Sequence, residues 1–157
     1  MPEFVLKNLY LAFIEPHVTY CLPIWGGTFP SYLQTLFILQ KRAIRIITKS
    51  SFLEHTRPLF CSRKILNIYD MLKMKVAEHV YRNINSYEFQ RHVHHHYTRR
   101  REDLVIPIHS LNTFQRSLSY CGPKIWNIIP EEIRNKRSLK VFQRLLKSNL
   151  LSKYELH

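Results

Sequence analysis

The densest group of chemically capable residues is RHVHHHYTRRR, residues 91–101. Histidine rings can bind a transition metal, whereas guanidinium groups hold phosphates through paired hydrogen bonds. A specific metal site needs ligands in fixed geometry, which a polar loop does not supply, so we predict none here. Arg99, Arg100 and Arg101, with Tyr97 as a ring that can stack on an unpaired base, instead favour an arm that binds nucleic acid. The alternative is a basic loop that only stays solvated.

A second basic group lies in the segment from Ser31 to about Lys49, where apolar residues recur at helical spacing. Projected at about 100° per residue, the segment has an apolar face and an opposite cationic face. No acid falls between Ser31 and Ser51 to neutralise the cations, which favours a phosphate-binding surface over an ordinary solvated face. The apolar face consists of Leu33, Leu36, Phe37, Ala43, Ile44 and Ile47, and the cationic face of Lys41, Arg42, Arg45 and Lys49.

Charge is the strongest signal in the composition. The chain of 157 residues has 24 Lys and Arg against 11 Asp and Glu, a formal net charge of +13. A surface this basic attracts polyanions, so nucleic acid and anionic membrane surfaces are the partners to consider. Because 45% of the residues are apolar, the chain can fill a core, and disorder is not expected.

The sequence lacks the residue sets that polymerases and nucleases use for catalysis. A two-metal site needs paired carboxylates around Mg²⁺, and the aspartates of this chain are Asp70 and Asp103, far apart in the sequence. The three glycines, Gly26, Gly27 and Gly122, do not form a phosphate-binding loop. We therefore predict no catalytic residue, no metal and no cofactor for the isolated chain.

The cysteines and one uncharged stretch bear on location. Cys21, Cys61 and Cys121 are odd in number and far apart, which suggests neither a disulfide framework nor a zinc site and favours a reduced, intracellular compartment, nuclear or cytoplasmic. Residues 16–40 contain no charged side chain and are long enough to span a bilayer as one helix. Prolines and a Gly-Gly pair interrupt the stretch, so we predict no membrane insertion.

The apolar periodicity predicts a mainly α fold, a small helical bundle of four or five helices with a long basic loop. Pro16 is expected to end or kink the first helix, and Ser31 and Ser138 are candidate caps of later ones. At most a minor β element is expected near 104–118, because Pro107 confines that stretch to an edge. The expected organisation is a helical unit at 1–84, a basic linker or loop at 85–110 and a helical tail unit at 111–157.

Four stretches in order resemble the carboxyl-terminal region of reverse transcriptases from non-LTR retrotransposons, the jockey-like elements in particular. They are LYLAFIEPHVTYCLPIWGG (9–27), YLQTLFILQKRAIRIIT (32–48), HHHYTRRR (94–101) and SYCGPKIWNIIPEEIRNKRSLKVFQRLLKSNLL (119–151). The resemblance extends from about Leu6 to the end of the chain. Tyr97, Thr98 and Arg99 match a Tyr-(Asn)-Thr-Arg element of the family, with the spacer Asn missing here.

The resemblance implies that residues 9–48 correspond to a thumb that grips a template-primer duplex of RNA or DNA. In the family, the palm with its catalytic aspartates precedes this region, so the chain would be a non-catalytic fragment of an RNA-directed DNA polymerase. The cationic face and the basic arm (Tyr97, Arg99, Arg100 and Arg101) would then contact the nucleic acid. Trp25, Gly122, Pro123, Trp126 and Pro130 match positions that look structural.

Two other functions compete with nucleic-acid binding. A remnant without its palm would expose apolar surface around Phe4–Trp25, which predicts self-association or binding of another protein, or an inert relic. Basic amphipathic helices could also bind an anionic membrane surface without inserting. Salt-sensitive binding to nucleic acid would favour the first hypothesis, and self-association that persists in high salt would favour the second.

Overall fold

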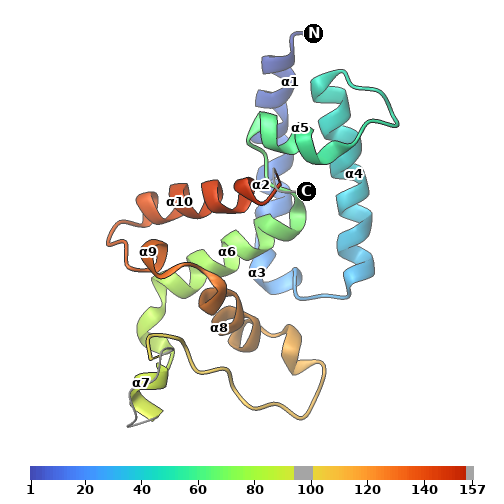
Figure 1. The fold of residues 1–157 in the computed structure, drawn as a ribbon. Helices are drawn as coiled ribbons and strands as arrows, with labels where there is room; N and C mark the ends of the chain where they lie inside the picture. Colours follow the sequence, from blue (N-terminus) through green and yellow to red (C-terminus); the bar gives the residue numbers. More distant parts are fainter. Residues whose placement is uncertain (94–100, 155–157) are drawn as a thin grey trace. The chain divides into compact units, whose positions relative to one another are not determined.

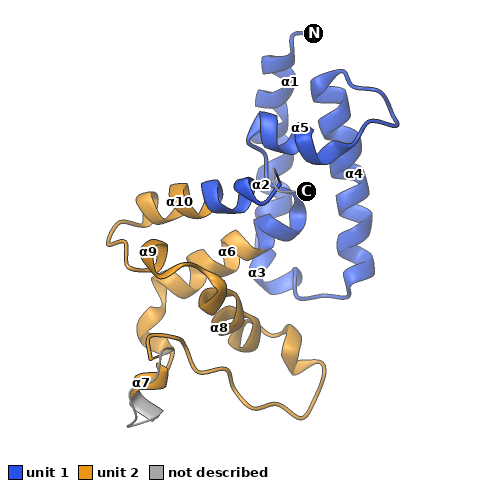
Figure 2. Ribbon diagram, viewed as in Figure 1, with its two compact units in different colours: residues 1–72, 147–157 blue, residues 73–146 orange. Residues whose placement is uncertain are grey.

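The structure, a computed structural model, describes residues 1–93 and 101–154 (Figure 1). These residues are mainly helical, with one isolated bridge between Phe89 and Leu104 and no strand, which confirms the predicted mainly α class. The backbone forms two compact units, residues 1–72 with 147–157 and residues 73–146 (Figure 2). Both boundaries expected from the sequence, near 84 and near 110, fall inside the second unit.

The first unit begins with one continuous helical run made of α1 (Glu3–Leu9), a π-helical turn (Tyr10–Ile14) and α2 (Glu15–Thr19). Pro16 therefore does not end the helix. A proline has no N–H to donate and its ring crowds the carbonyl four residues earlier. The wider π turn directly before it relieves that crowding, and the Glu15 N–H accordingly bonds the carbonyl of Tyr10, five residues back.

Three further helices complete this part of the chain: α3 (Leu22–Trp25), α4 (Pro30–Thr48) and α5 (Thr56–Arg63). The N-cap of α4 is Phe29 and not Ser31, because Pro30 occupies the first turn, where its missing N–H and fixed φ are favourable. Helices α4 and α5 both end at a lysine in the left-handed conformation, Lys49 with φ 55° and Lys64 with φ 55°.

A buried amide organises the core of the first unit. The Gln40 Nε2 donates to the Tyr10 hydroxyl at 2.8 Å and to the Leu66 carbonyl at 2.9 Å, while its Oε1 accepts from the Ile68 N–H at 2.8 Å. Every polar atom of this amide thus has a partner, which offsets the cost of its burial. The apolar core around it contains Leu22, Leu33, Ile44, Ile47, Phe60, Ile65, Leu66, Ile68, Met71 and Leu150.

The second unit is built from further helices and short turns. Two helices, α6 (Ile68–Arg82) and α10 (Leu139–Ser152), contribute residues to both units. Between them lie the 3-10 turn Ile84–Ser86, α7 (Gln90–Val93), the 3-10 turn Phe114–Arg116, α8 (Leu118–Ile128) and α9 (Glu131–Arg134). The carbonyl of Ser138 accepts the first bond of α10, from Phe142, so that helix begins where the sequence predicted.

Three aromatic rings form the centre of the second unit. Tyr81 stacks on Phe142 at 4.7 Å between ring centroids, and Trp126 packs on Phe142 at 5.8 Å. The Tyr81 hydroxyl donates to the Lys136 carbonyl at 2.6 Å, so the polar end of the ring is satisfied. In the described part of the chain, no helix combines the length and the apolar character needed to cross a bilayer.

Candidate nucleic-acid interface

Helix α4 places the cationic face along its length of 19 residues. At 1.5 Å of rise per residue, Lys41 and Lys49 are about 12 Å apart along the axis, and the four cations fall within an arc of about 100°. The opposite side packs into the core through Leu33, Ile44 and Ile47, which are buried. That burial fixes the rotation of α4 and directs the cations away from the core.

Two of the four cations are held against aromatic rings. The Lys41 Nζ lies 4.3 Å from the centroid of the Phe37 ring, one helical turn earlier. The Arg45 guanidinium lies 5.6 Å from the centroid of the Phe52 ring. Arg45 also donates from Nε (3.2 Å) and Nη2 (2.9 Å) to the Glu54 carbonyl. These contacts restrict both side chains, which reduces the entropy lost when they bind a ligand.

The other two cations face solvent. Arg42 is exposed in the middle of α4, and Lys49 is exposed at the residue that caps its carboxyl end. Within the described residues, none of the four cations forms an ion pair with a carboxylate. The sequence accounts for this, because residues 16–53 contain neither Asp nor Glu. The face therefore presents uncompensated positive charge.

Of the predicted basic arm, Tyr97, Arg99 and Arg100 lie outside the described residues, as do His94, His95 and His96. Arg101 is described and exposed, and its carbonyl accepts from the Arg91 N–H at 3.1 Å.

Short antiparallel pairing joins the chain before and after the arm. The Gln90 N–H donates to the Asp103 carbonyl at 2.9 Å, and the Val105 N–H donates to the Glu88 carbonyl at 2.8 Å. The isolated bridge between Phe89 and Leu104 belongs to the same pairing. The expected linker at 85–110 is thus paired at residues 88–91 and 101–105.

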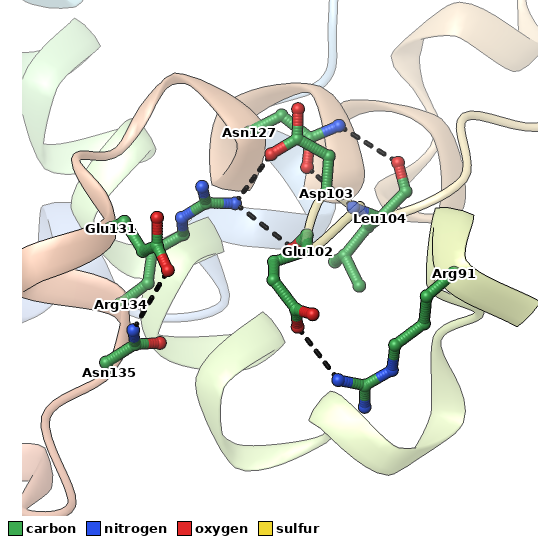
Figure 3. A network of polar contacts seen from close by, with 8 residues as sticks. All are labelled: Arg91, Glu102, Asp103, Leu104, Asn127, Glu131, Arg134 and Asn135. Carbon is green, nitrogen blue, oxygen red and sulfur yellow. Dashed lines mark hydrogen bonds and ion pairs between the residues drawn. The ribbon is translucent and has the colours of Figure 1, made fainter. Parts of the chain in front are cut away.

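Polar contacts hold the segment that follows the arm, residues 101–105 (Figure 3). The Arg134 Nη1 donates to the Asp103 Oδ1 at 2.9 Å, and both side chains are mostly buried, with 12% and 16% exposed. The Asn127 amide bonds both backbone groups of Leu104, at 2.8 Å to the N–H and 2.9 Å to the carbonyl. Glu102 accepts from Arg91 at 2.8 Å.

The predicted residues thus divide between the two units. The cationic face belongs to the first unit, and Arg101 with the base of the arm belongs to the second. The aromatic supports of the cations were missed by sequence reasoning. The four-residue spacing of Phe37 and Lys41 is a detectable signal for one of them, whereas Phe52 and Arg45 meet only through the turn after α4. Within residues 1–93 and 101–154, no group of three metal-binding side chains is present.

Comparison of the chain with protein-family models, with curated proteins and with solved structures finds no match.

Proposed function

We propose that this chain is a non-catalytic nucleic-acid-binding protein that holds the sugar-phosphate backbone of RNA or DNA. The cationic face of α4 and the basic arm are the contact surfaces. We further propose, from the resemblance of its four ordered stretches, that it corresponds to the thumb and post-thumb region of a jockey-like non-LTR retrotransposon reverse transcriptase. Its ligand in that setting is the template-primer duplex, and its setting is intracellular, nuclear or cytoplasmic.

The observation that carries the proposal is the uncompensated charge of the cationic face. Arg42 and Lys49 are exposed, Lys41 and Arg45 are ordered by aromatic rings, and no carboxylate in the described residues pairs with any of them. Ordinary surface cations of globular proteins are interspersed with acids, which keeps their local potential low. A row of cations about 12 Å long instead spans several phosphates, which follow one another at about 3.4 Å along the axis of one duplex strand.

Little sequence specificity is expected from this surface. Lysine and arginine contacts to phosphates position a protein on its ligand but do not read bases. A base-reading element needs side chains that reach the groove edges, and nothing in the sequence identifies such an element. Binding to duplex DNA, RNA–DNA hybrid and single strands is therefore expected, with affinity that depends mainly on salt.

The test is a fluorescence-anisotropy titration of the full chain with labelled duplex DNA, hybrid and single-stranded probes at low salt. We expect association with at least one probe, and we expect Arg42→Glu with Arg45→Glu to weaken it while helical circular dichroism stays intact. Because Arg45 also binds the Glu54 carbonyl, Arg42→Glu alone gives the cleaner measure of charge.

Arg144→Glu is the matched control, since Arg144 is an exposed arginine on α10 outside the proposed surface. It changes the net charge of the chain by the same amount as Arg42→Glu. A general charge effect would weaken both variants equally and would argue against the α4 surface. No association of the parent chain with any probe at low salt would end the proposal.

Self-association is a second candidate function, because large apolar side chains are exposed in the first helical run and in α3. Phe4 is 66% exposed, Phe13 is 65% exposed and Ile24 is 76% exposed. Apolar patches of this kind mark association surfaces. Light scattering that shows oligomers persisting in high salt would favour this function over the electrostatic one.

A further inference from the structure

An apolar groove runs between the first helical run and α4, within the first unit. It has a volume of about 180 Å³, and its walls are Ile14 and Val18 on one side and Leu36, Leu39 and Ala43 on the other. None of the four residues of the cationic face lines this groove.

The floor of the groove is the hydrogen-bonded amide of Gln40. Its bonds to the Tyr10 hydroxyl, the Leu66 carbonyl and the Ile68 N–H hold that floor in one arrangement. A groove with a fixed floor needs little reorganisation when a ligand enters it.

The α4 wall continues into an apolar seam. Tyr32, Leu36, Leu39, Ala43 and Ile46 follow one another at intervals of four, three, four and three residues, the spacing at which one helix packs along another. Tyr32 is 64% exposed, Leu39 is 52% exposed and Ile46 is 65% exposed, so the described part of the chain leaves these three largely uncovered, whereas Leu36 and Ala43 are half-buried.

The positive charge beside the seam indicates the charge of the segment that binds there. Arg42 and Lys49 are seven residues apart, about 10 Å along the axis, on the edge of the seam that faces away from the core. A second copy of this chain would bring the same cations, and its net charge of +13, against this edge. A helix with acidic side chains along one edge would instead complement it.

We propose that the groove binds an amphipathic helix of another protein, one whose apolar residues have four-three spacing and whose flanking residues are acidic. Its apolar seam lies between the two walls, and its acids face Arg42 and Lys49. A recess of about 180 Å³ with two apolar walls suits the apolar side chains of a helix that packs across both walls, whereas a flat lipid surface would contact only the rims. This proposal shares Arg42 and Lys49 with the cationic face, and its apolar residues Leu39 and Ile46 distinguish it from nucleic-acid binding.

The test uses a labelled synthetic peptide of about 20 residues with leucines at four-three spacing and glutamates on both flanks. A second peptide has the same composition with the leucine spacing scrambled. In anisotropy titrations with the full chain, we expect the first peptide to bind at least about tenfold more tightly than the second. Equal binding of the two peptides would overturn the proposal.

Variants of α4 test whether the peptide binds along the apolar seam. Leu39→Gln with Ile46→Gln should weaken the peptide roughly tenfold or more, because both side chains lose apolar contact area. Ile128→Gln is the control, since Ile128 is 67% exposed on α8 and lies outside both the seam and the cationic face; it should change the affinity by less than about twofold. Both variants should bind nucleic acid as the parent does, which separates failure of this proposal from failure of the nucleic-acid proposal.

A charge swap tests the orientation of the acids. Arg42→Glu with Lys49→Glu should weaken the acidic peptide and should strengthen a version with lysines in place of its glutamates. An unchanged preference for the acidic peptide would contradict the proposal. So would a parent chain that dimerises, or that binds anionic vesicles, through Leu39 and Ile46 without preferring the seam peptide, since the occupant would then be a second copy or a membrane.

Discussion

Two tyrosines in the first unit are buried as neutral, hydrogen-bonded groups. Burial raises the pKa of Tyr10 to about 12, against the lowering effect of its bond from Gln40. Burial, followed by the hydrogen bond to Asp70, raises the pKa of Tyr154 further. The Tyr154 hydroxyl also accepts from the Asn67 side chain at 2.6 Å, which ties the carboxyl-terminal end of the described chain to the start of α6. Both hydroxyls need their protons for the folded state.

Alkaline pH should therefore destabilise the fold. An unfolded tyrosine loses its proton near pH 10, whereas folded Tyr10 keeps it until about pH 12. The unfolded state binds fewer protons in this range, so Tyr10 should reduce the free energy of unfolding by about 1.4 kcal/mol per pH unit between 10 and 12. Urea unfolding from pH 8 to 12 measures this slope.

Tyr10→Phe supplies the comparison. At pH 8 it should cost about 1 kcal/mol, because the Gln40 amide loses a partner. Above pH 10 its stability should fall less steeply than that of the parent chain, since Phe has no proton to lose. Parallel pH curves for the two proteins would show that Tyr10 is not the titrating group.

The ion pair between Arg134 and Asp103 is the second residue-level test, because both partners are mostly buried. Asp103→Asn should reduce the free energy of unfolding by about 1 to 3 kcal/mol, since it leaves a buried guanidinium without its counter-charge. Asp103→Asn combined with Arg134→Met should recover part of this loss. A double-mutant cycle in urea measures the coupling, and strictly additive losses would show that the pair contributes no interaction energy.

The carboxyl end of helix α5 offers a substitution that should stabilise the protein. Helix α5 ends at Lys64 with φ 55°, a conformation that costs an L-residue free energy and glycine none. The Ile65 N–H bonds the Phe60 carbonyl at 3.0 Å, the pattern in which glycine is favoured at this position. Lys64→Gly should therefore stabilise the protein by about 0.5 to 1 kcal/mol in urea unfolding.

Lys64→Ala is the control for losing the lysine side chain, and it should stabilise the protein little or not at all because alanine keeps the strain. Destabilisation by the glycine variant would mean that the lysine stem makes a contact stronger than the relieved strain. The equivalent change at Lys49 is less informative, because that residue belongs to the proposed cationic face.

The long helices could be predicted from the sequence because each has one strongly periodic apolar face. The segments expected at 31–49 and after Ser138 correspond to α4 and α10. Periodicity did not show which apolar residues stay uncovered: Leu39 and Ile46 are exposed, because their burial depends on what packs there and not on α4 itself. Leu36 and Ala43, expected in the core, are half-buried and line the groove.

Contacts between residues that are distant in the sequence could not be predicted from any local sequence pattern. Gln40 reads as a surface residue, yet it is buried because Tyr10, Leu66 and Ile68 supply its partners. The pairing of 88–91 with 101–105 is likewise non-local, and its hydrogen bonds join segments separated by the arm. For the candidate site, the sequence located the cationic face of α4, but the rings that order two of its cations required the fold.

At the scale of the whole molecule, the net charge of +13 complicates any test of a local surface. A strongly basic chain attracts a polyanion from many directions, and this long-range attraction weakens as salt shortens the Debye length. Direct phosphate contacts differ, because each one releases counterions in a fixed proportion. The salt dependence of binding therefore reports how many cations touch the nucleic acid.

If the four cations of α4 are the contacts, the logarithm of the duplex association constant should fall against the logarithm of salt concentration with a slope of about −3.6. Arg42→Glu with Arg45→Glu should reduce the slope to about −2, and single strands should give a smaller slope than duplex because they release fewer counterions per contact. Anisotropy titrations between about 50 and 200 mM salt measure these slopes. A slope clearly steeper than −4 would add the basic arm to the contacts, and Arg101→Gln should then reduce it by about one. Binding that is indifferent to salt would contradict phosphate contact altogether, and the exposed apolar surface would become the better explanation of any association.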